Sequence, residues 1–544
     1  MVDNGIPLSE TKFKPDFEAV IIGAGMSGLY QLYRIRELGM SVRVIEAGSD
    51  VGGTWYWNRY PGARFDSESY TYAYSFSKEL LDEWRWTEHF APQPETLRYV
   101  NFVADKFDLR RDIMFNRKVI SAHWQEENGS WLLHFDNGEQ MTARFLITAI
   151  GALSVPTLPR IEGIDRFEGL SCHTAQWPRE PVRFEGKSVA VIGTGATGIQ
   201  VIQEVAKTAG MLTVFQRTGN WSAPLNNSLI TEEQQRELKA SYQDIFKQCM
   251  ENVSGFVHNP DPRRATEVTA AEREAFWEKR YAEPGFGIWM GNFRDVLIDR
   301  EANALMSDYV TKKVYQRVKN PAVAAKLIPK NHGFGTRRLP LETKYFEIYN
   351  QPNVDLVDIL ETPIERVTAH GIKTTERDFE FDIIIYATGF DALTGAFDKI
   401  DFRGRGGLRL KAQWTPGART FHGMLNAGFP NLLMVMGPLG ALGNIPRSIE
   451  YNVEWVSKLL RHMRDRGQTR VQARPESVDA WMDVVGALSV GLLSNEVDSW
   501  MTGVNTNVEG KTTRVLARFS GTGPDFRARS DAVAAGGYRE LDLS

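Results

Sequence analysis

Cysteine is scarce in this sequence, and its scarcity excludes two kinds of site. The chain of 544 residues contains only two cysteines, Cys172 and Cys249. Two cysteines do not make a disulfide framework, and these two lack the C-x-x-C spacing of a dithiol redox centre. No His, Cys, Asp or Glu residues have recognisable metal-ligand spacing either, so we expect no metal site. This composition suits a reducing cytoplasm.

Excess positive charge and long apolar runs are also missing. The formal net charge is -4, so the chain has no basic field for a polyanion and we expect no nucleic-acid partner. The first 17 residues are polar, and no uninterrupted apolar run approaches the roughly 20 residues that cross a bilayer. We therefore expect a soluble cytoplasmic protein without a membrane partner, as a monomer or a weak homo-oligomer.

Glycine, in contrast, recurs in two similar patterns, each between a predicted strand and a predicted helix. The first pattern places a strand, a Gly-x-Gly-x-x-Gly loop, a helix and a second strand at 19–22, 23–28, 29–38 and 42–45. The second repeats this order at 189–192, 193–198, through about 207, and around 212–215. Such glycines permit a tight turn and let a pyrophosphate approach the backbone at the helix start. Two copies predict two nucleotides and an α/β fold with two Rossmann-like, doubly wound dinucleotide-binding domains.

The two patterns differ where their second strands end. Glu46 follows the first, and its carboxylate can accept hydrogen bonds from the ribose of FAD or NAD. Arg217 and Thr218 stand at the equivalent place of the second, where no carboxylate occurs. Arginine and threonine can bind a 2'-phosphate, so this site favours NADPH. The alternative is that Arg217 is a solvated surface arginine.

The stretch 52–62, Gly-Gly-Thr-Trp-Tyr-Trp-Asn-Arg-Tyr-Pro-Gly, is unusually aromatic for a loop. It could let the backbone approach a flavin ring, with Trp55 stacking nearby. A packed aromatic corner of the core is the alternative interpretation.

Composition changes along the chain predict the domain order. Residues from about 225 to 335 are charged and favour helices, whereas strands return after about 340. The final 80 residues are irregular and punctuated by glycine. Because 544 residues exceed what one core usually organises, we expect several parts. These are the first nucleotide domain at 1–150 and 386–544, the latter with a C-terminal loop region; the second at 151–225 and 336–385; and a mostly helical insertion at 226–335.

One further stretch narrows the chemistry. Residues 167–178 fit the pattern F-x-G-x-x-x-H-x-x-x-W-P through Phe167, Gly169, His173 and Trp177. With both glycine loops, the 52–56 stretch and Ala-Thr-Gly-Phe-Asp at 387–391, the chain resembles the class B flavin monooxygenases. More narrowly, it resembles the Baeyer-Villiger monooxygenases of the cyclohexanone and phenylacetone types, from about residue 17 to 535.

The resemblance implies FAD and NADPH as cofactors, and a small-molecule ketone and O2 as partners. NADPH would reduce FAD, and an anionic flavin C4a-peroxide would convert a cyclic, aliphatic or aryl ketone to a lactone or ester. Arg338 in Phe-Gly-Thr-Arg-Arg resembles the catalytic arginine, and Asp66 the carboxylate that orients it. Arginine suits this task because it stays protonated in a partly dry site. A salt-bridged core arginine is the alternative interpretation of Arg338.

The same resemblance assigns the cofactor contacts. FAD would be bound by Gly23, Gly25, Ser27, Gly28, Glu46, Gly53, Thr54, Trp55, Asp66, Tyr72 and Ile445. NADP would be bound by Gly193, Thr194, Gly195, Ala196, Thr197, Gly198, Arg217, Thr218, Arg337 and Trp500. Arg337 would add a second contact to the 2'-phosphate, and Trp500 would lie on a mobile loop that closes over NADP. The alternative for Trp500 is a buried loop tryptophan.

Two other segments receive roles by resemblance. His173, in the 167–178 motif, would be a structural or gating element at a hinge between domains, not a proton shuttle. Leu439 and Leu442 would lie on a substrate loop of the shorter, cyclohexanone type, although their residue types depart from that pattern. The size of the pocket does not follow from the sequence.

Two other functions stay open at this point. A flavin monooxygenase that oxidises sulfur or nitrogen nucleophiles would share both nucleotide sites, but it would not need Arg338 or the 167–178 motif. A noncatalytic nucleotide-binding redox sensor would be expected to have lost one of the loops or one of the two charged residues.

Overall fold

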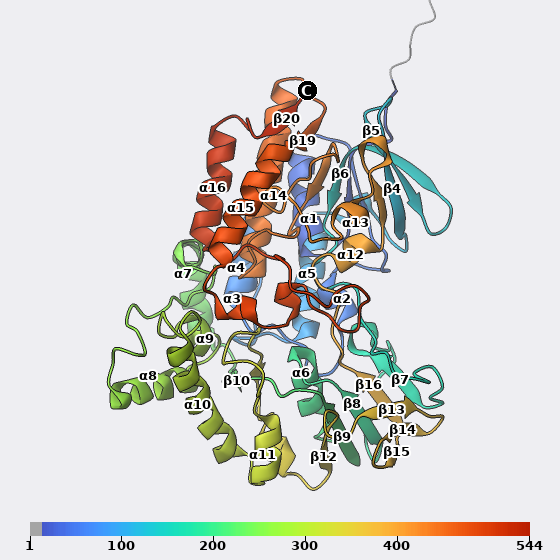
Figure 1. The fold of residues 1–544 in the computed structure, drawn as a ribbon. Helices are drawn as coiled ribbons and strands as arrows, with labels where there is room; N and C mark the ends of the chain where they lie inside the picture. The colour runs from blue at the N-terminus through green and yellow to red at the C-terminus, as the bar shows by residue number, and fades with distance from the viewer. Residues whose placement is uncertain (1–12) are drawn as a thin grey trace, which may run out of the picture.

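Two sheets flanked by helices organise the chain, and Figure 1 shows them one above the other. The structure is a computed structural model that describes residues 13–544. The first sheet has the order β17-β4-β5-β6-β1-β2-β3, with β18 also paired to β6. Its strands are β1 Phe17–Ile22, β2 Val42–Ile45, β3 Ile113–Met114, β4 Val119–Gln125, β5 Ser130–Phe135, β6 Gln140–Thr148, β17 Asp401–Arg403 and β18 Leu432–Met434.

The second sheet is parallel throughout, in the order β12-β9-β8-β16-β7. Its strands are β7 Leu170–His173, β8 Ser188–Ile192, β9 Met211–Gln216, β12 Val354–Asp358 and β16 Ile383–Tyr386. A small antiparallel sheet of β13 Ile364–Val367, β14 Gly371–Thr374 and β15 Asp378–Glu380 adjoins it in Figure 1. Parallel strands joined through helices give the doubly wound α/β fold predicted from the two glycine patterns.

Each glycine loop leads from the first strand of its unit into a helix. These helices are α1 Met26–Glu37 and α6 Ala196–Val205. Helix α1 begins three residues before its predicted start at Leu29, because the end of the loop is already helical. A side chain on Gly28 would place its Cβ 1.8 Å from the carbonyl oxygen of Gly23, so only glycine fits this turn.

Two backbone segments run side by side between the sheets. The segment after β6 and the segment after β16 are joined by hydrogen bonds from Thr157 N to Gly389 O at 3.0 Å and from Asp391 N to Val155 O at 2.8 Å. The chain therefore passes between the two sheets twice, through two segments that lie side by side. These crossovers lie close to the predicted boundaries near 150 and 385, and the division into domains stays a prediction.

Helices fill most of the segment predicted as a helical insertion. They are α7 Glu232–Glu251, α8 Ala270–Ala282, α9 Gly287–Met290, α10 Arg300–Arg317 and α11 Pro321–Leu327. Reciprocal side-chain caps at Thr231 and Thr269 start α7 and α8. Helix α7 packs into the core of the first sheet through Tyr242 and Phe246, and α8, α9 and α10 share a core around Trp277. Helix α11 packs into the core of the second sheet through Ala324 and Leu327.

The final 80 residues are more regular than the sequence suggested, so the prediction of an irregular loop region was wrong there. They contain α15 Pro475–Ser489 and α16 Gly523–Ala535, together with the strand pair β19 Val471–Ala473 and β20 Leu541–Leu543, and they follow α14 Ile445–Asp465. Pro475 and Pro524 stand at the first helical turns, where proline is favourable, and Thr522 caps α16. Irregular chain remains between α15 and α16, and it crosses the middle of the molecule in Figure 1.

Short elements complete the fold. They are α2 Thr54–Trp57, α3 Ser69–Tyr72, α4 Lys78–Glu83, α5 Gln93–Lys106, α12 Gly395–Asp398, α13 Leu410–Gln413, β10 Ala223–Pro224 and β11 Leu341–Glu342. Within residues 13–544, no helix combines the length and the apolar character needed to cross a membrane.

Candidate active site

The first glycine loop meets the aromatic stretch of the sequence at very short range. A Cβ on Gly53 would lie 2.8 Å from the α carbon of Gly25, and Gly53 has a φ of 52°. Gly53 therefore does not accept a larger residue, and Gly25 leaves little room for one, since a Cβ there would lie 3.3 Å from the Gly53 α carbon. Ser27 and Gly28 lie in the first turn of α1, whose free amide groups suit a phosphate group.

Glu46 stands at the end of β2 and faces this loop. Its carboxylate accepts hydrogen bonds from the amides of Ala24 at 2.7 Å and Gly48 at 2.6 Å, one on each oxygen. Burial raises the pKa of this carboxyl, while the two amides act in the opposite direction. Each oxygen keeps a lone pair, so the site can still accept two ribose hydroxyl groups.

Part of the aromatic stretch packs in an aromatic corner, whereas Trp57 of the same stretch is exposed, and a flavin contact of the stretch stays a prediction. Trp55 is buried and donates its indole N–H to the Tyr72 hydroxyl at 3.0 Å. Tyr72 stacks on Phe65 with 4.3 Å between ring centroids. Trp55 therefore does not present a free face for stacking. Thr54, at the start of α2, is exposed, and so is Ile445 at the start of α14.

The second glycine loop has open space above its central glycine. A Cβ on Gly195 would meet no atom within 4 Å, whereas one on Gly198 would lie 2.2 Å from the Gly193 carbonyl oxygen. The loop residues Ala196 and Thr197 are the first two residues of α6. Thr194 donates its hydroxyl to the Thr218 carbonyl at 3.0 Å. The backbone at Gly195 thus leaves room for a pyrophosphate.

Two arginines lie near each other beyond this loop. Burial, and then the positive charge of Arg217, lower the pKa of Arg337. The Nε atom of Arg337 is buried, and no acceptor among residues 13–544 reaches it. Arg217 donates to the Thr506 hydroxyl at 2.8 Å, and the described part of the chain offers neither arginine an ion pair. Two such guanidinium groups fit a dianionic phosphate.

Arg338 pairs with Asp66 across 272 residues of sequence. Arg338 Nη1 donates to Asp66 Oδ2 at 2.7 Å, and the Leu341 amide reaches the same oxygen at 3.3 Å. The Asp66 side chain is 1% exposed and that of Arg338 is 33% exposed. Asp66 Oδ1 is buried, and no donor in the described residues reaches it. The Asp66 carboxylate is thus held in place, whereas part of the Arg338 side chain remains exposed to solvent.

The segment that carries Asp66 touches the helix of the second glycine loop. The Tyr60 hydroxyl donates to Gln200 of α6 at 2.7 Å, and Gln200 donates to the Arg64 carbonyl at 3.0 Å. A Cβ on Gly62 would lie 2.6 Å from the Gln200 carbonyl oxygen. The Asp66–Arg338 pair therefore lies where the two nucleotide units meet.

The 167–178 motif forms the edge of the second sheet. His173 ends β7 and accepts a hydrogen bond from the Ala175 amide, and its ring meets Phe390 of the crossover edge-on at 5.8 Å. Burial lowers the pKa of His173 to about 4. A neutral, buried imidazole is suited to packing and poorly suited to proton transfer near pH 7. Trp177 is buried against Phe184.

The remaining motif positions pack around the start of β7. Phe167 is half-buried, and a Cβ on Gly169 would lie 2.6 Å from the Asp382 carbonyl oxygen.

The segment that carries Trp500 docks on the crossover. Trp500 is half-buried in a short 3-10 turn. The side-chain amides of Asn505 and Asn507 donate to the carbonyls of Phe390 at 2.8 Å and Thr388 at 3.3 Å. Lys511 adds an ion pair with Asp391 to these contacts. The segment is thus held against the crossover, and its closure over NADP stays a prediction.

The two leucines of the predicted substrate loop differ in position. Leu439 has no exposed surface, adopts a φ of 65° and packs in the core, and its role on a substrate loop stays a prediction. Leu442 is half-buried, and its neighbour Gly443 packs against Ser254, where a Cβ would lie 2.3 Å from the carbonyl oxygen. The loop is therefore held against the segment that follows α7.

No pattern in the sequence indicated that two phenylalanines lie near Arg338. The Arg338 guanidinium lies 5.8 Å from the centre of the Phe286 ring, and Phe286 meets Phe256 at 5.3 Å. Both are buried. They come from the insertion, far along the chain from Asp66 and from the 439–443 loop, so no local pattern links them.

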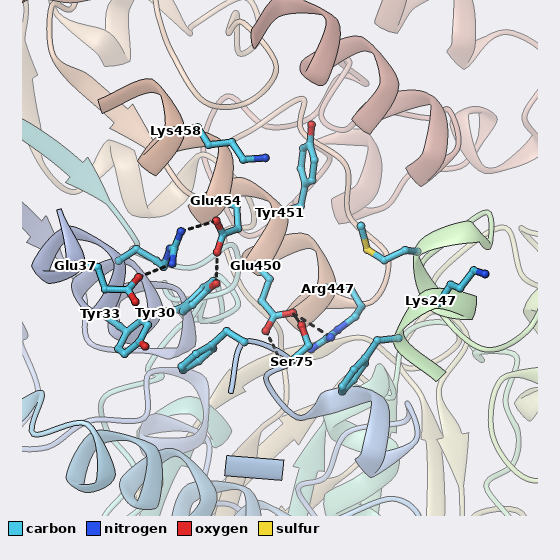
Figure 2. Close-up of a pocket in the computed structure, with 14 residues that line it drawn as sticks. Tyr30, Tyr33, Glu37, Ser75, Lys247, Arg447, Glu450, Tyr451, Glu454 and Lys458 are labelled. Carbon is cyan, nitrogen blue, oxygen red and sulfur yellow. Dashed lines mark hydrogen bonds and ion pairs between the residues drawn. The ribbon is translucent and has the colours of Figure 1, made fainter. Parts of the chain in front are cut away.

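A separate cavity of about 510 Å³ lies between α1, α7 and α14, as Figure 2 shows. Its charged groups bond to one another: Glu454 accepts from Tyr30 and Arg34, and Glu450 from Ser75 and Arg447. None of its lining residues belongs to the predicted site. These contacts tie α1 to α14.

The fold and these loops define a flavin-binding monooxygenase-like protein, since a family model of that description matches residues 17–228. Two relatives extend the match over the chain. The 2-oxo-Delta(3)-4,5,5-trimethylcyclopentenylacetyl-CoA monooxygenase of Pseudomonas putida is 44% identical and covers 99% of this chain and 100% of its own length. A Baeyer-Villiger monooxygenase of Pseudooceanicola batsensis is 40% identical, with coverages of 97% and 96%.

A solved structure agrees. The crystal structure of OTEMO in complex with FAD and NADP superimposes with a TM-score of 0.94 at 44% identity, and covers 98% of this chain and 100% of its own. The chain belongs to the Baeyer-Villiger monooxygenases.

Proposed function

We propose that Arg338 and Asp66 form the catalytic centre of a monooxygenase that uses FAD, NADPH and O2 to convert ketones to lactones or esters. When bound, FAD that NADPH has reduced activates O2 for insertion of one oxygen atom beside the carbonyl. The observation that carries this proposal is the 2.7 Å ion pair between the two residues where the nucleotide units meet.

Arg338 supplies a permanent positive charge beside the reacting atoms. Its guanidinium stays protonated in a partly dry site and can stabilise an oxyanion that forms at the ketone carbon. Asp66 holds Nη1, so the guanidinium plane keeps one orientation while its other N–H groups stay available. The exposed third of the Arg338 side chain marks the face that would meet the reactants.

The cofactor sites follow the two glycine loops. We place FAD on the first loop with its ribose at Glu46, and NADPH on the second loop with its 2'-phosphate between Arg217 and Arg337. The open space at Gly195 and the buried Nε of Arg337 support the second assignment. Trp500 would cover NADPH from the docked segment.

The ketone would lie beside the exposed part of the Arg338 side chain, whose guanidinium faces the buried aromatic pair Phe286 and Phe256. Apolar rings packed behind the arginine favour apolar ketones. The Pseudomonas putida relative is named for a cyclopentenone that carries a coenzyme A thioester, so cyclic five-membered ketones are the first substrates to test.

Replacement of the arginine tests the proposal. We expect Arg338→Ala to keep FAD and to oxidise NADPH, but to release hydrogen peroxide with lactone formation reduced by about 1000-fold. Lactone yield per NADPH, measured by gas chromatography with cyclopentanone, gives the answer. Undiminished lactone formation would contradict the assignment. Asp66→Asn should retain more activity than Arg338→Ala, because it removes the orientation and not the charge.

We also propose that the protein is cytoplasmic, that it is a monomer or a weak homo-oligomer, and that it has no nucleic-acid partner. Light scattering of the purified protein tests the state of association.

A further inference from the structure

A second carboxylate on the Asp66 segment is buried, and its only side-chain partner comes from the helical insertion. Glu68 is 5% exposed, and its Oε1 lies 2.8 Å from Nε2 of His258. The other oxygen, Oε2, is buried, and no donor in the part of the chain that the structure describes reaches it. A buried carboxylate with one partner depends strongly on that partner.

The pair is enclosed by the two glycines that flank Phe286. Gly285 has a φ of 76°, and a Cβ there would lie 2.9 Å from Glu68 Oε1. A Cβ on Gly287 would lie 3.7 Å from the His258 ring. The backbone on both sides of Phe286 therefore packs directly on the pair. The Arg338 guanidinium faces the ring of this same Phe286, so the pair and the arginine lie on either side of one residue.

The same region joins three loops that are distant in sequence. The Asn444 side chain donates to the Thr71 hydroxyl at 3.1 Å, and the Asn444 amide donates to the Ser254 carbonyl at 2.9 Å. With Glu68 and His258, these bonds connect the Asp66 segment, the segment after α7 and the 439–443 loop. The contact between Glu68 and His258 is the only one of the three formed by two ionisable side chains.

We propose that Glu68 and His258 are positioning residues that hold the aromatic surface of Phe286 and Phe256 against Arg338 and thereby determine which ketones the site accepts. This inference rests on the proposed function of Arg338. Neither residue takes part in the chemistry. Loss of the pair frees Phe286 to move away from Arg338, which favours a bulky ketone over a small one.

The test uses the purified FAD holoenzyme with NADPH and two ketones, cyclopentanone and 4-phenylcyclohexanone. The measured quantity is the ratio of kcat/KM for the two, from lactone formation. We expect Glu68→Ala and His258→Ala each to shift this ratio about tenfold toward the bulky ketone. The double variant should show the same shift as either single variant, because both disrupt one contact. Glu68→Gln, which can still hydrogen-bond to His258, should stay near the wild-type ratio.

A second histidine–carboxylate pair provides the matched control. His123 lies 3.4 Å from Asp401 between β4 and β17, with both side chains partly exposed. His123→Ala should leave the ratio unchanged. FAD content and the rate of flavin reduction by NADPH identify variants that fail to fold, and Glu68→Leu and His258→Leu, which fill more of the space and also lack the hydrogen bond, then replace the alanine variants.

Two outcomes would overturn the inference, and they are distinguishable. If the wild type makes no lactone from either ketone, the proposed function fails and the positioning role fails with it. If the wild type makes lactones but both ketones lose kcat/KM equally in Glu68→Ala and His258→Ala, the proposed function stands and the pair has no positioning role.

Discussion

The two nucleotide units of this chain share a backbone design and differ in their charges. In both, a strand leads through three glycines into a helix, and the last glycine touches the carbonyl of the first. The first unit then presents a buried glutamate, which two backbone amides hold. The second presents two arginines without an acidic partner in the described residues. Backbone shape thus provides a place for a pyrophosphate, and the strand ends decide which nucleotide occupies it.

A change in the glycines should have the largest effect, because it acts on the shared backbone. Gly28→Ala would force a Cβ to within 1.8 Å of the Gly23 carbonyl oxygen, so we expect little or no folded, FAD-loaded protein. Flavin absorbance of the soluble fraction measures this. A change at the second glycine of the other loop, Gly195→Ala, meets no protein atom. It should keep FAD and lower only kcat/KM for NADPH, and FAD loss in this variant would show that the units are not independent.

Removal of the two arginine charges should distinguish the two nucleotide units most clearly, because it should weaken the use of NADPH and leave FAD bound. We expect Arg217→Ala combined with Arg337→Ala to lower kcat/KM for NADPH by about 100-fold through loss of charge-assisted hydrogen bonds, with little change for NADH. FAD content should be unaffected. Steady-state NADPH and NADH oxidation rates measure the effect. An equal loss for both nucleotides would mean that these arginines do not contact the 2'-phosphate.

Replacement of the glutamate should give a smaller effect in the other unit. Glu46→Gln keeps the shape but directs an N–H group toward an amide donor of Ala24 or Gly48. We expect FAD to dissociate about tenfold more readily, with the KM for NADPH unchanged. Fluorescence of released FAD on dilution measures this. Glu127→Gln, on an exposed turn, is the control. Weaker NADPH binding with normal FAD binding would reverse the assignment of the two loops.

The smallest effect on cofactor binding and catalysis is expected at His173, where the prediction concerns stability at acidic pH instead. The folded state holds the pKa of His173 at about 4, below that of an unfolded histidine. The unfolded chain therefore binds more protons between these values, and the histidine lowers stability as the pH falls from about 6.5 to 4. His173→Gln should remove a loss on the order of 3 kcal/mol over this range, measured by urea unfolding at several pH values. An altered pH profile of lactone formation near neutrality would contradict a purely structural role.

Local patterns in the sequence sufficed to predict the two nucleotide units. The strand at Val42–Ile45 has the predicted bounds, and the glycine loops stand between strand and helix as their spacing requires. The pairing of Asp66 with Arg338 came from resemblance to a family, since no local pattern links residues 272 positions apart. The helices α15 and α16 were missed because glycine and proline were read as signs of irregular chain, although both prolines stand at helix starts.

Tertiary packing explains the other differences. Leu439 lies in the core because the 439–443 loop turns at a positive φ and returns along the Ala517 backbone, which the sequence of the loop does not encode. Phe286 and His258 reach the site from the insertion, where charged helices give no indication of a contact with Glu68 or Arg338.

The most direct test of the central claim is the fate of molecular oxygen. Purified, yellow, FAD-loaded protein is supplied with NADPH, cyclopentanone and oxygen-18 gas, and the product is examined by mass spectrometry. The account predicts a lactone that carries one oxygen-18 atom in its ring, and its loss in Arg338→Ala while NADPH is still consumed. A product with no label, or NADPH oxidation that gives only hydrogen peroxide in the wild type across the ketones tested, would contradict it.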